Sequence, residues 1–326
     1  MVEESTTRNL ERQLQLGKTK VLEGHTNWIR TVFAINNLII SGSDDNTIRI
    51  WNINTSKCLK VLEGHTSSVY SIFVKDNLII SGSLDKTIRI WDITSGDCLK
   101  ALEGHTAYVY SVFVKDNLII SGSNDKTIRI WDMNSWECIK VLEGHTDRVI
   151  SVFVKDNLII SSSDDTTIRI WDINTGDCLK VLEGHTNWVR SVFVKDNLII
   201  SGSEDNTIRI WDIESGDCLK VLEGHTSYVC SVFVKDNLII SCSDDSTIRI
   251  WDINTGDCLK VLEGHTDSVW SVFVKDNLII SGSYDKTIRI IPITLFPGEL
   301  EVFQSIIDEY WLARNLEREI MRYFGC

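Results

Sequence analysis

A 40-residue repeat dominates the sequence and limits the possible folds more than any other feature. All seven histidines are spaced 40 residues apart, and each follows a glycine in the segment LEGHT or its direct equivalent. Each is followed at fixed distances by NLIIS and by a segment of the form S-x-D-x-T-I-R-I. Self-similarity at this period is typical of repeat architectures, so the chain is interpreted as a set of stacked units rather than as two ordinary domains.

Each unit is predicted to form four short strands. In residues 149–183 these are VISVFV, LIISSS, TIRIWDI and CLKVLE, separated by the turns KDN, DDT and NTGD. Val, Ile and Phe dominate the strands, whereas Asn, Asp, Gly and Ser fill the turns. The turns follow one another too closely for helices. Seven four-stranded units that stack around an axis predict an all-β, seven-bladed propeller.

Composition excludes several classes of protein. The 326 residues are 43% apolar, which is enough for a large core, and the net charge of −13 argues against nucleic acid and anionic membranes as partners. No apolar run reaches membrane-spanning length, and residues 1–20 are polar, without a secretion segment. Six of the nine cysteines lie 40 residues apart and no CxxC pair is present. We expect reduced cysteines, no cofactor, no metal and a cytoplasmic location, with the nucleus left open.

The combination of GH near the start of a unit, S-x-D in its middle and WD after the third strand resembles the WD40-repeat β-propellers. The resemblance covers residues 18–291 in seven in-phase copies, and six copies carry the Trp of WD. In that family the GH histidine, a second-strand serine, the turn aspartate and the third-strand tryptophan form a hydrogen-bonded tetrad in each blade. The corresponding residues here are His25, Ser41, Asp45, Trp51; His65, Ser81, Asp85, Trp91; His105, Ser121, Asp125, Trp131; His145, Ser161, Asp165, Trp171; His185, Ser201, Asp205, Trp211; and His225, Ser241, Asp245, Trp251.

The tetrads are interpreted as structural. A His/Asp pair is also what a catalytic dyad or a metal site would contain, but seven copies in separate blades favour architecture. Buried His and Asp must satisfy each other, and Trp adds apolar area and an N–H donor. We therefore predict no catalytic residues.

The last unit departs from the pattern. It keeps its His, Ser and Asp, but Ile291 replaces Trp and Pro292 replaces the following Asp, and no fourth strand follows. Residues 18–23 (KTKVLE) align with the missing strand (CLKVLE). The resemblance implies that this N-terminal strand closes the last blade.

Differences between the repeats concentrate just after GHT and beside the turn Asp, whereas the KDN turn is invariant from the second unit onward. Both variable turns lie at the same end of the strands, so we expect these side chains to converge on one face, here called the upper face, around the central channel. The set is rich in Trp, Tyr and Arg, which dominate interface hot spots. Free drift of exposed loops is the alternative. The predicted partner-binding residues are Trp28, Arg30, Asp44, Tyr70, Tyr108, Tyr110, Arg148, Asp164, Trp188, Arg190, Glu204, Tyr228, Asp244, Trp270 and Tyr284.

Two segments flank the repeats. Residues 1–17 are interpreted as a polar leader, with a short helix over 7–15 as the alternative. Residues 292–326 are interpreted as a helical tail, because apolar residues recur with helical spacing from Gly298 to Phe324. This helix either packs on the propeller or docks another protein or a second copy; the propeller itself is expected to be monomeric.

The leading hypothesis for function is a non-enzymatic interaction scaffold that binds a protein or peptide, one with at least one basic group, on the upper face. The sequence of the repeat is also similar to that of the repeats in F-box/WD40 proteins. This resemblance implies a substrate-recognition subunit of a ubiquitin ligase. In those proteins arginines at the positions of Arg30 and Arg190, and before the turn Asp, bind phosphate. Here the position before the turn Asp is never Arg, and the residues before Lys18 are too few for an F-box. A glycan-binding propeller is the third hypothesis, because exposed Trp and Tyr also stack on sugars.

Overall fold

The computed structural model describes residues 14–295. The expected C-terminal helix from Gly298 onward lies outside the described residues, as do residues 1–13. The chain divides into two units, Lys18–Ile291 and Met1–Gly17 with Pro292–Cys326.

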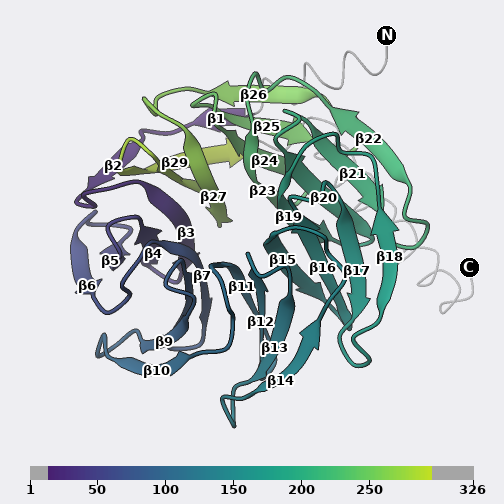
Figure 1. Ribbon diagram of the computed structural model, residues 1–326. Coiled ribbons are helices and arrows are strands. Elements are labelled where there is room, and N and C mark those ends of the chain that lie inside the picture. Colours follow the sequence, from purple (N-terminus) through teal and green to yellow (C-terminus); the bar gives the residue numbers. More distant parts are fainter. Residues whose placement is uncertain (1–13, 296–326) are drawn as a thin grey trace, which may run out of the picture. The chain divides into compact units, whose positions relative to one another are not determined.

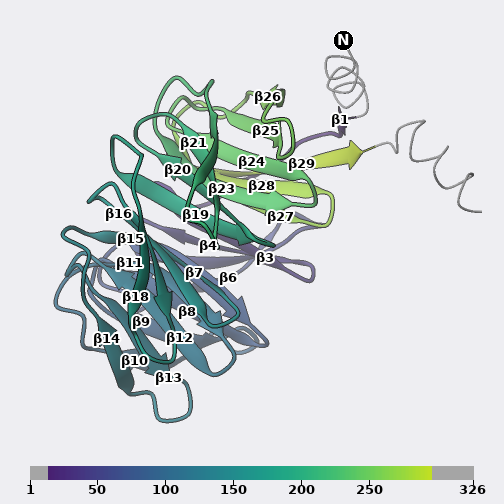
Figure 2. The same ribbon diagram turned by 90° about the vertical axis from the view of Figure 1, so that its right-hand side faces the viewer.

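The unit Lys18–Ile291 is a seven-bladed β-propeller (Figure 1). Blade one consists of β3 (Ile29–Ile35), β4 (Leu38–Ser43), β5 (Ile48–Asn52) and β6 (Cys58–Leu62), paired antiparallel in this order. β3 is mainly alternating in burial, β4 is buried on both faces and β6 is mostly exposed, and the tight turns between the strands place Asn36, Asn46 and Ser56 in the left-handed region. Figure 2 gives the same blades from the side.

Blades two to six repeat this order. Their strands are β7 (Val69–Lys75), β8 (Leu78–Ser83), β9 (Ile88–Asp92) and β10 (Cys98–Leu102); β11 (Val109–Lys115), β12 (Leu118–Ser123), β13 (Ile128–Asp132) and β14 (Cys138–Leu142); β15 (Val149–Lys155), β16 (Leu158–Ser163), β17 (Ile168–Asp172) and β18 (Cys178–Leu182); β19 (Val189–Lys195), β20 (Leu198–Ser203), β21 (Ile208–Asp212) and β22 (Cys218–Leu222); and β23 (Val229–Lys235), β24 (Leu238–Ser243), β25 (Ile248–Asp252) and β26 (Cys258–Leu262).

Blade seven joins the two ends of the propeller sequence. It contains β27 (Val269–Lys275), β28 (Leu278–Ser283) and β29 (Thr287–Leu295), and its outer strand is β2 (Lys20–Glu23). The β2–β29 register pairs Lys20 with Ile290 and Glu23 with Thr287. The N-terminal strand therefore occupies the place of the missing fourth strand.

The other unit contains one strand pair among its described residues. β1 (Leu14–Leu16) pairs with the end of β29, with Leu16 opposite Ile293, and the Gly17 N–H donates to the Pro292 carbonyl at 2.8 Å. Residues 14–16 and 292–295 are strand residues, which neither the leader nor the tail interpretation included. Pro292 does not end β29, since its carbonyl still accepts a hydrogen bond although its nitrogen has none to donate.

The apolar core lies between neighbouring blades. One cluster combines Ile160 and Ile168 of blade four with Val189 and Trp211 of blade five, and each is at most 1% exposed. Burial of each such side chain stabilises the fold by roughly 1.5–3 kcal/mol. Serine hydroxyls add ties between blades: the Val152 N–H donates to Ser111 Oγ of the preceding blade at 3.0 Å.

The inner strands of the seven blades, β3, β7, β11, β15, β19, β23 and β27, lie nearest the axis of the propeller in Figure 1. Seven phenylalanines, one per blade, form a closed ring with neighbouring centroids 4.6–5.4 Å apart. Two residues before each phenylalanine stands a serine, or Thr31 in blade one, and before that a residue that differs from blade to blade. These differing residues lie at the upper end of the channel.

Candidate functional site

Each of blades one to six brings its four tetrad residues together. In blade four the Trp171 indole N–H donates to Ser161 Oγ at 2.8 Å, Ser161 Oγ lies 2.7 Å from His145 Nε2, and His145 Nδ1 lies 2.7 Å from Asp165 Oδ2. Since Ser161 accepts from Trp171, its hydroxyl donates to Nε2, and Nδ1–H donates to the carboxylate. The equivalent distances in the other blades differ by no more than about 0.1 Å in this chain of hydrogen bonds.

The electrostatics of the tetrads in blades one, three and four favour the neutral histidine and the charged aspartate. Burial lowers the pKa of His25, His105 and His145, against the hydrogen bond to the aspartate, which raises it. Burial raises the pKa of Asp165, but hydrogen bonds from His145 and Thr167 outweigh it and hold that pKa well below its usual range. Both ring nitrogens are engaged, so neither is available as a base or a metal ligand. Blade seven keeps the His265, Ser281 and Asp285 contacts, with buried Ile291 at the tryptophan position.

The two variable turns of each blade are joined by a backbone hydrogen bond. In blade one the Asp44 N–H donates to the Trp28 carbonyl at 2.9 Å, and the same bond recurs in all seven blades. The structure therefore brings together the positions after GHT and before the turn Asp, around the upper end of the channel.

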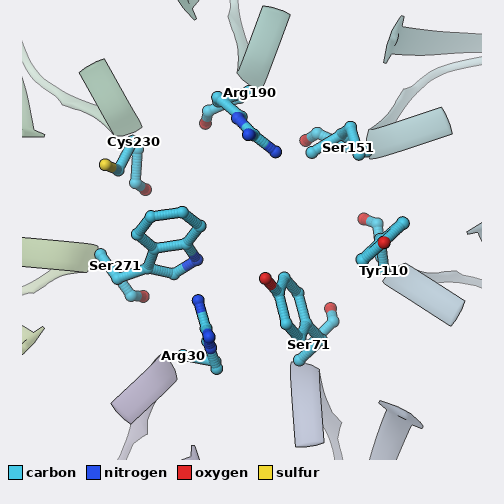
Figure 3. A pocket seen from close by; sticks show the side chains of 13 residues that line it. Arg30, Ser71, Tyr110, Ser151, Arg190, Cys230 and Ser271 are labelled. Atoms are coloured by element: carbon cyan, nitrogen blue, oxygen red, sulfur yellow. The ribbon is translucent and has the colours of Figure 1, made fainter. Parts of the chain in front are cut away.

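A cavity of about 160 Å³ opens at this end (Figure 3), and we call it the chamber. Its lining contains two guanidinium groups and no carboxylate. Figure 3 shows Arg30 and Arg190 extending toward the middle of the opening from opposite sides. The chamber is lined by Arg30, Tyr70, Tyr110, Ile150, Arg190, Cys230, Trp270, Ser71, Ser111, Ser151, Ser191, Ser231 and Ser271.

Sequence reasoning missed some chamber residues. Ile150, Cys230 and the six serines were not among the predicted site residues. The serines are the same in every unit from the second onward, so a comparison of repeats could not single them out. Ile150 and Cys230 occupy the same ring position as Arg30, and the position itself was the available signal.

Blades seven and one form an aromatic cluster. Tyr284 lies between Trp28 and Trp270, with stacked rings at centroid distances of 4.1 and 5.0 Å. Arg30 lies 4.6 Å from the Tyr284 ring centroid, and its Nε and Nη2 donate to the two oxygens of Asp44 at 2.8 and 2.7 Å. The arginine is thus both stacked and neutralised.

Blades four and five form a second cluster around Trp188. Arg148 and Arg190 lie 4.7 and 5.0 Å from its ring centroid. Arg190 Nε donates to Glu204 Oε1 at 2.7 Å, and Arg148 forms an ion pair with Asp164. The Asn-Trp-x-Arg sequence that blades one and five share therefore has the same Arg–carboxylate pairing in both places.

Other predicted residues have different surroundings. Tyr108 and Tyr228 are each 42% exposed, and Tyr110 packs edge-on against Tyr70. Asp244 accepts hydrogen bonds from the hydroxyls of Ser227 and Ser268. Asp164 and Glu204 are buried, and each is paired with an arginine of this chain, Arg148 and Arg190 respectively. Intramolecular arginines take the role that was expected of the partner.

Two classes of feature are absent from residues 14–295. No group of three or more His, Cys, Asp or Glu side chains is placed to hold a metal ion. The same residues contain no helix that is long and apolar enough to span a bilayer.

Fold and site together define a closed, seven-bladed propeller with an aromatic, arginine-containing upper mouth. The family described as WD domain, G-beta repeat (WD40) matches residues 17–52, 56–92, 96–132, 136–172, 176–212, 216–252 and 256–291. These seven matches cover most of the chain. The protein belongs to the WD40 family.

Individual relatives match over about one repeat. The chain is 42% identical over 43 residues to the probable E3 ubiquitin ligase complex SCF subunit sconB of Arthroderma otae, covering 13% of this chain and 6% of the relative. It is 42% identical over 50 residues to F-box/WD repeat-containing protein 7 of Drosophila melanogaster, covering 15% and 4%. The nuclear distribution protein PAC1 of Eremothecium gossypii is 40% identical over 48 residues, covering 15% and 10%. The matches thus span a tenth or less of these relatives.

Proposed function

We propose that this protein is a non-enzymatic interaction scaffold that binds a protein or peptide on the upper face of the propeller. WD40 propellers are typically protein-interaction scaffolds. The observation that carries the proposal is the chamber: the positions at which the blades differ surround a cavity at one end of the channel. Cavities that combine aromatic walls with a few polar groups suit ligand segments.

The surrounding residues suit a protein partner. Trp28 is 40% exposed although it stacks on Tyr284, so part of its surface is available to a ligand. Aromatic and arginine side chains that are already held by their neighbours lose little entropy on binding. The side chains around the mouth of the chamber, here called the rim, therefore form a pre-organised binding surface.

The tetrads argue against catalysis. Every histidine lies in one of them, and both ring nitrogens are hydrogen-bonded. An acid–base mechanism needs a group free to exchange a proton with substrate.

A substrate-recognition role in a ubiquitin ligase is the second candidate. It is favoured by the relatives named as an SCF subunit and an F-box/WD protein, and by the two arginines in the chamber wall. A glycan-binding surface is the third, because Tyr108 and Tyr228 are well exposed.

The test is capture of partners from cell lysate with three baits, identified by mass spectrometry. The first is the intact chain and the second carries Trp28→Ala, Tyr110→Ala, Trp188→Ala and Trp270→Ala. The third is a matched control with Leu99→Ala, Leu179→Ala and Leu219→Ala, which are exposed residues of the outer strands. Circular dichroism checks that all three are folded.

Partners that are retained by the control and lost from the upper-face variant support the proposal. Equal partner sets for all three baits overturn it. Competition by free sugar would identify a glycan-binding propeller instead, and ubiquitin ligase subunits among the retained partners would favour the second candidate.

A further inference from the structure

Every well exposed aromatic side chain of residues 14–295 lies on the upper face. These side chains are Trp28, Tyr108 and Tyr228, which are 40%, 42% and 42% exposed. All three occupy the same place in their repeats, three residues after the tetrad histidine, in blades one, three and six. Their rings are flat apolar surfaces that a ligand can stack on. The most accessible contacts of the upper face are therefore aromatic.

The charged residues of the predicted partner-binding set are all engaged within the chain. The three arginine–carboxylate pairs are Arg30 with Asp44, Arg148 with Asp164, and Arg190 with Glu204. Asp244, the acid of blade six, accepts hydrogen bonds from the hydroxyls of Ser227 and Ser268. A charged ligand group of either sign would have to compete with one of these partners and also lose its hydration. Electrostatics therefore favour an uncharged ligand.

The chamber presents hydrogen-bond donors more than acceptors. Among the described residues, its lining contains no carboxylate and no carboxamide. Five of its serines accept a backbone N–H from the next blade, which leaves their O–H groups to donate; these are Ser71, Ser111, Ser151, Ser191 and Ser271.

Two nitrogen-containing side chains add to the donors of the chamber. The indole of Trp270, which can only donate, belongs to the lining. Arg190 extends toward the middle of the opening (Figure 3) and uses Nε and Nη2 on Glu204, which leaves Nη1 to donate. A ligand group with carbonyl oxygens and no N–H of its own fits this lining best.

We propose that the upper face binds a proline-rich segment of a partner protein, with part of the segment inserted into the chamber and the remainder lying across the exposed rings. Proline is uncharged, its ring packs on aromatic side chains, and its backbone offers a carbonyl acceptor without an N–H donor. Proline-rich segments are already extended in the polyproline II conformation, so they lose little entropy on binding. This inference rests on the proposed function and specifies the chemistry of the partner.

An oligosaccharide is the alternative ligand that would also stack on the exposed rings. Its hydroxyl groups bring donors as well as acceptors, so they match a donor-rich lining less well than carbonyl groups do. The volume of the chamber is about 160 Å³, below the roughly 300–1,000 Å³ of pockets that enclose a whole small ligand. This size suits a narrow peptide segment that enters the chamber over a short length.

The experiment measures the binding of uncharged peptides to the full chain by NMR titration. The test probe is acetyl-hexaproline amide. Acetyl-hexasarcosine amide has the same backbone carbonyls without N–H groups but lacks the rings, and an alternating Ala-Ser hexapeptide is uncharged but keeps its N–H groups. We expect hexaproline to bind tighter than either control by about tenfold or more, because it alone combines rings, acceptors and a pre-ordered backbone.

Two variants locate the binding, and circular dichroism checks that both are folded. The triple variant Trp28→Ala, Tyr108→Ala, Tyr228→Ala removes the exposed rings and should reduce the affinity for hexaproline to that of the control peptides. Trp270→Phe keeps a ring in the chamber but removes its N–H, and should weaken binding by about two- to tenfold.

Trp136→Gly is the matched control. Trp136 lies in the turn between β13 and β14, at the end of the strands opposite the upper face, and glycine occupies the equivalent position in blades two, four, five and six. This variant also removes one tryptophan, but it should bind hexaproline as the intact chain does.

Equal binding of hexaproline and either control peptide overturns the proposal, as does a preference for hexaproline that survives in both upper-face variants. Tighter binding of an alternating Ser-Glu or Ser-Lys hexapeptide overturns it in favour of a charged ligand, and tighter binding of maltohexaose overturns it in favour of a glycan. The result is separable from the capture experiment. Partners lost from the upper-face bait without a preference for hexaproline leave the proposed function standing and remove only this ligand class. Equal partner sets for all baits remove the function, whichever peptide binds.

Discussion

The tetrads and the upper rim, meaning the positions after GHT and before the turn Asp, lie in the same blades. The tetrad residues are repeated from blade to blade, whereas the rim residues vary. The tetrads have the same side chains and the same hydrogen bonds in blades one to six, and they are buried. The rim positions vary between blades, although blades one and five share Asn-Trp-x-Arg, and their side chains contact different kinds of neighbour: stacked aromatics at Tyr284, an arginine at Asp44 and hydroxyls at Asp244. The same backbone hydrogen bond supports all seven versions of the rim.

The comparison shows how a repeat separates stability from specificity. A buried hydrogen-bond chain tolerates little change, because a missing member leaves a buried polar group short of a partner. Blade seven, with Ile291 in place of the tryptophan, is the exception among the seven blades. The rim tolerates change because its backbone is already fixed and its side chains are partly solvated. Variation there alters what the surface binds more than whether the blade forms.

The largest effect is expected in the tetrads. Trp171→Ala in blade four removes a large buried side chain and the N–H that donates to Ser161, and should cost about 3–5 kcal/mol of the free energy of unfolding. Trp171→Ile copies the blade-seven arrangement and should cost less. Urea denaturation followed by circular dichroism measures both; a loss below about 1 kcal/mol for Trp171→Ala would contradict the comparison.

A smaller effect is expected where the rim itself is buried. Arg30→Gln leaves Asp44 without its two hydrogen bonds and removes the guanidinium from the aromatic cluster, so a loss of about 1–3 kcal/mol is expected. Tyr108→Ala, at a well exposed rim position, should change stability by about 0.5 kcal/mol or less. The same denaturation assay applies. Equal losses for the two variants would mean that the rim is structurally uniform.

The smallest effect is the pH dependence that the tetrads impose. The pKa of His25, His105 and His145 is lowered in the fold, so the unfolded chain binds more protons than the folded chain as pH falls below about 6.5. The tetrad aspartates, whose pKa is held below its usual range, add a second loss below about pH 4. Stability should therefore be constant above about pH 7 and decrease on acidification.

Thermal melts from about pH 8 to pH 4, in about 0.3 M salt to screen the net charge of −13, measure this dependence. A melting temperature that rises between pH 7 and pH 5 would show that the histidines are not held neutral. The Trp171→Ala variant serves as the control, because it perturbs one tetrad and leaves the others intact.

Much of the architecture follows from the 40-residue period. The number of blades, the four strands and the closing strand at residues 20–23 could be predicted because each depends on local patterns that recur. The convergence of the two variable turns could be predicted as well, since they lie at the same end of paired strands. These features depend on backbone topology alone.

Side-chain partners across blades could not be predicted in the same way. The stack of Trp28 on Tyr284 joins blades one and seven, which are far apart in the sequence, and Asp164 pairs with Arg148 of the turn rather than with a residue at the position of Ile150. The strand nature of residues 14–16 was missed because three residues carry too little pattern, and Pro292 favoured a break. Each case depends on a contact that the repeat does not encode.

The offset between sequence repeats and blades has a consequence for folding. The matched segment 136–172 contains β14, the outer strand of blade three, followed by β15–β17 of blade four, and the other repeats are offset in the same way. A single excised repeat would therefore leave one strand without its sheet and one sheet without its edge. In an open solenoid the end repeats can unfold one at a time. In this propeller each sequence repeat supplies the outer strand of one blade and three strands of the next, all the way around the ring. Unfolding should accordingly be cooperative over the whole ring, and the β2–β29 pairing is the step that converts seven interdependent pieces into one folding unit.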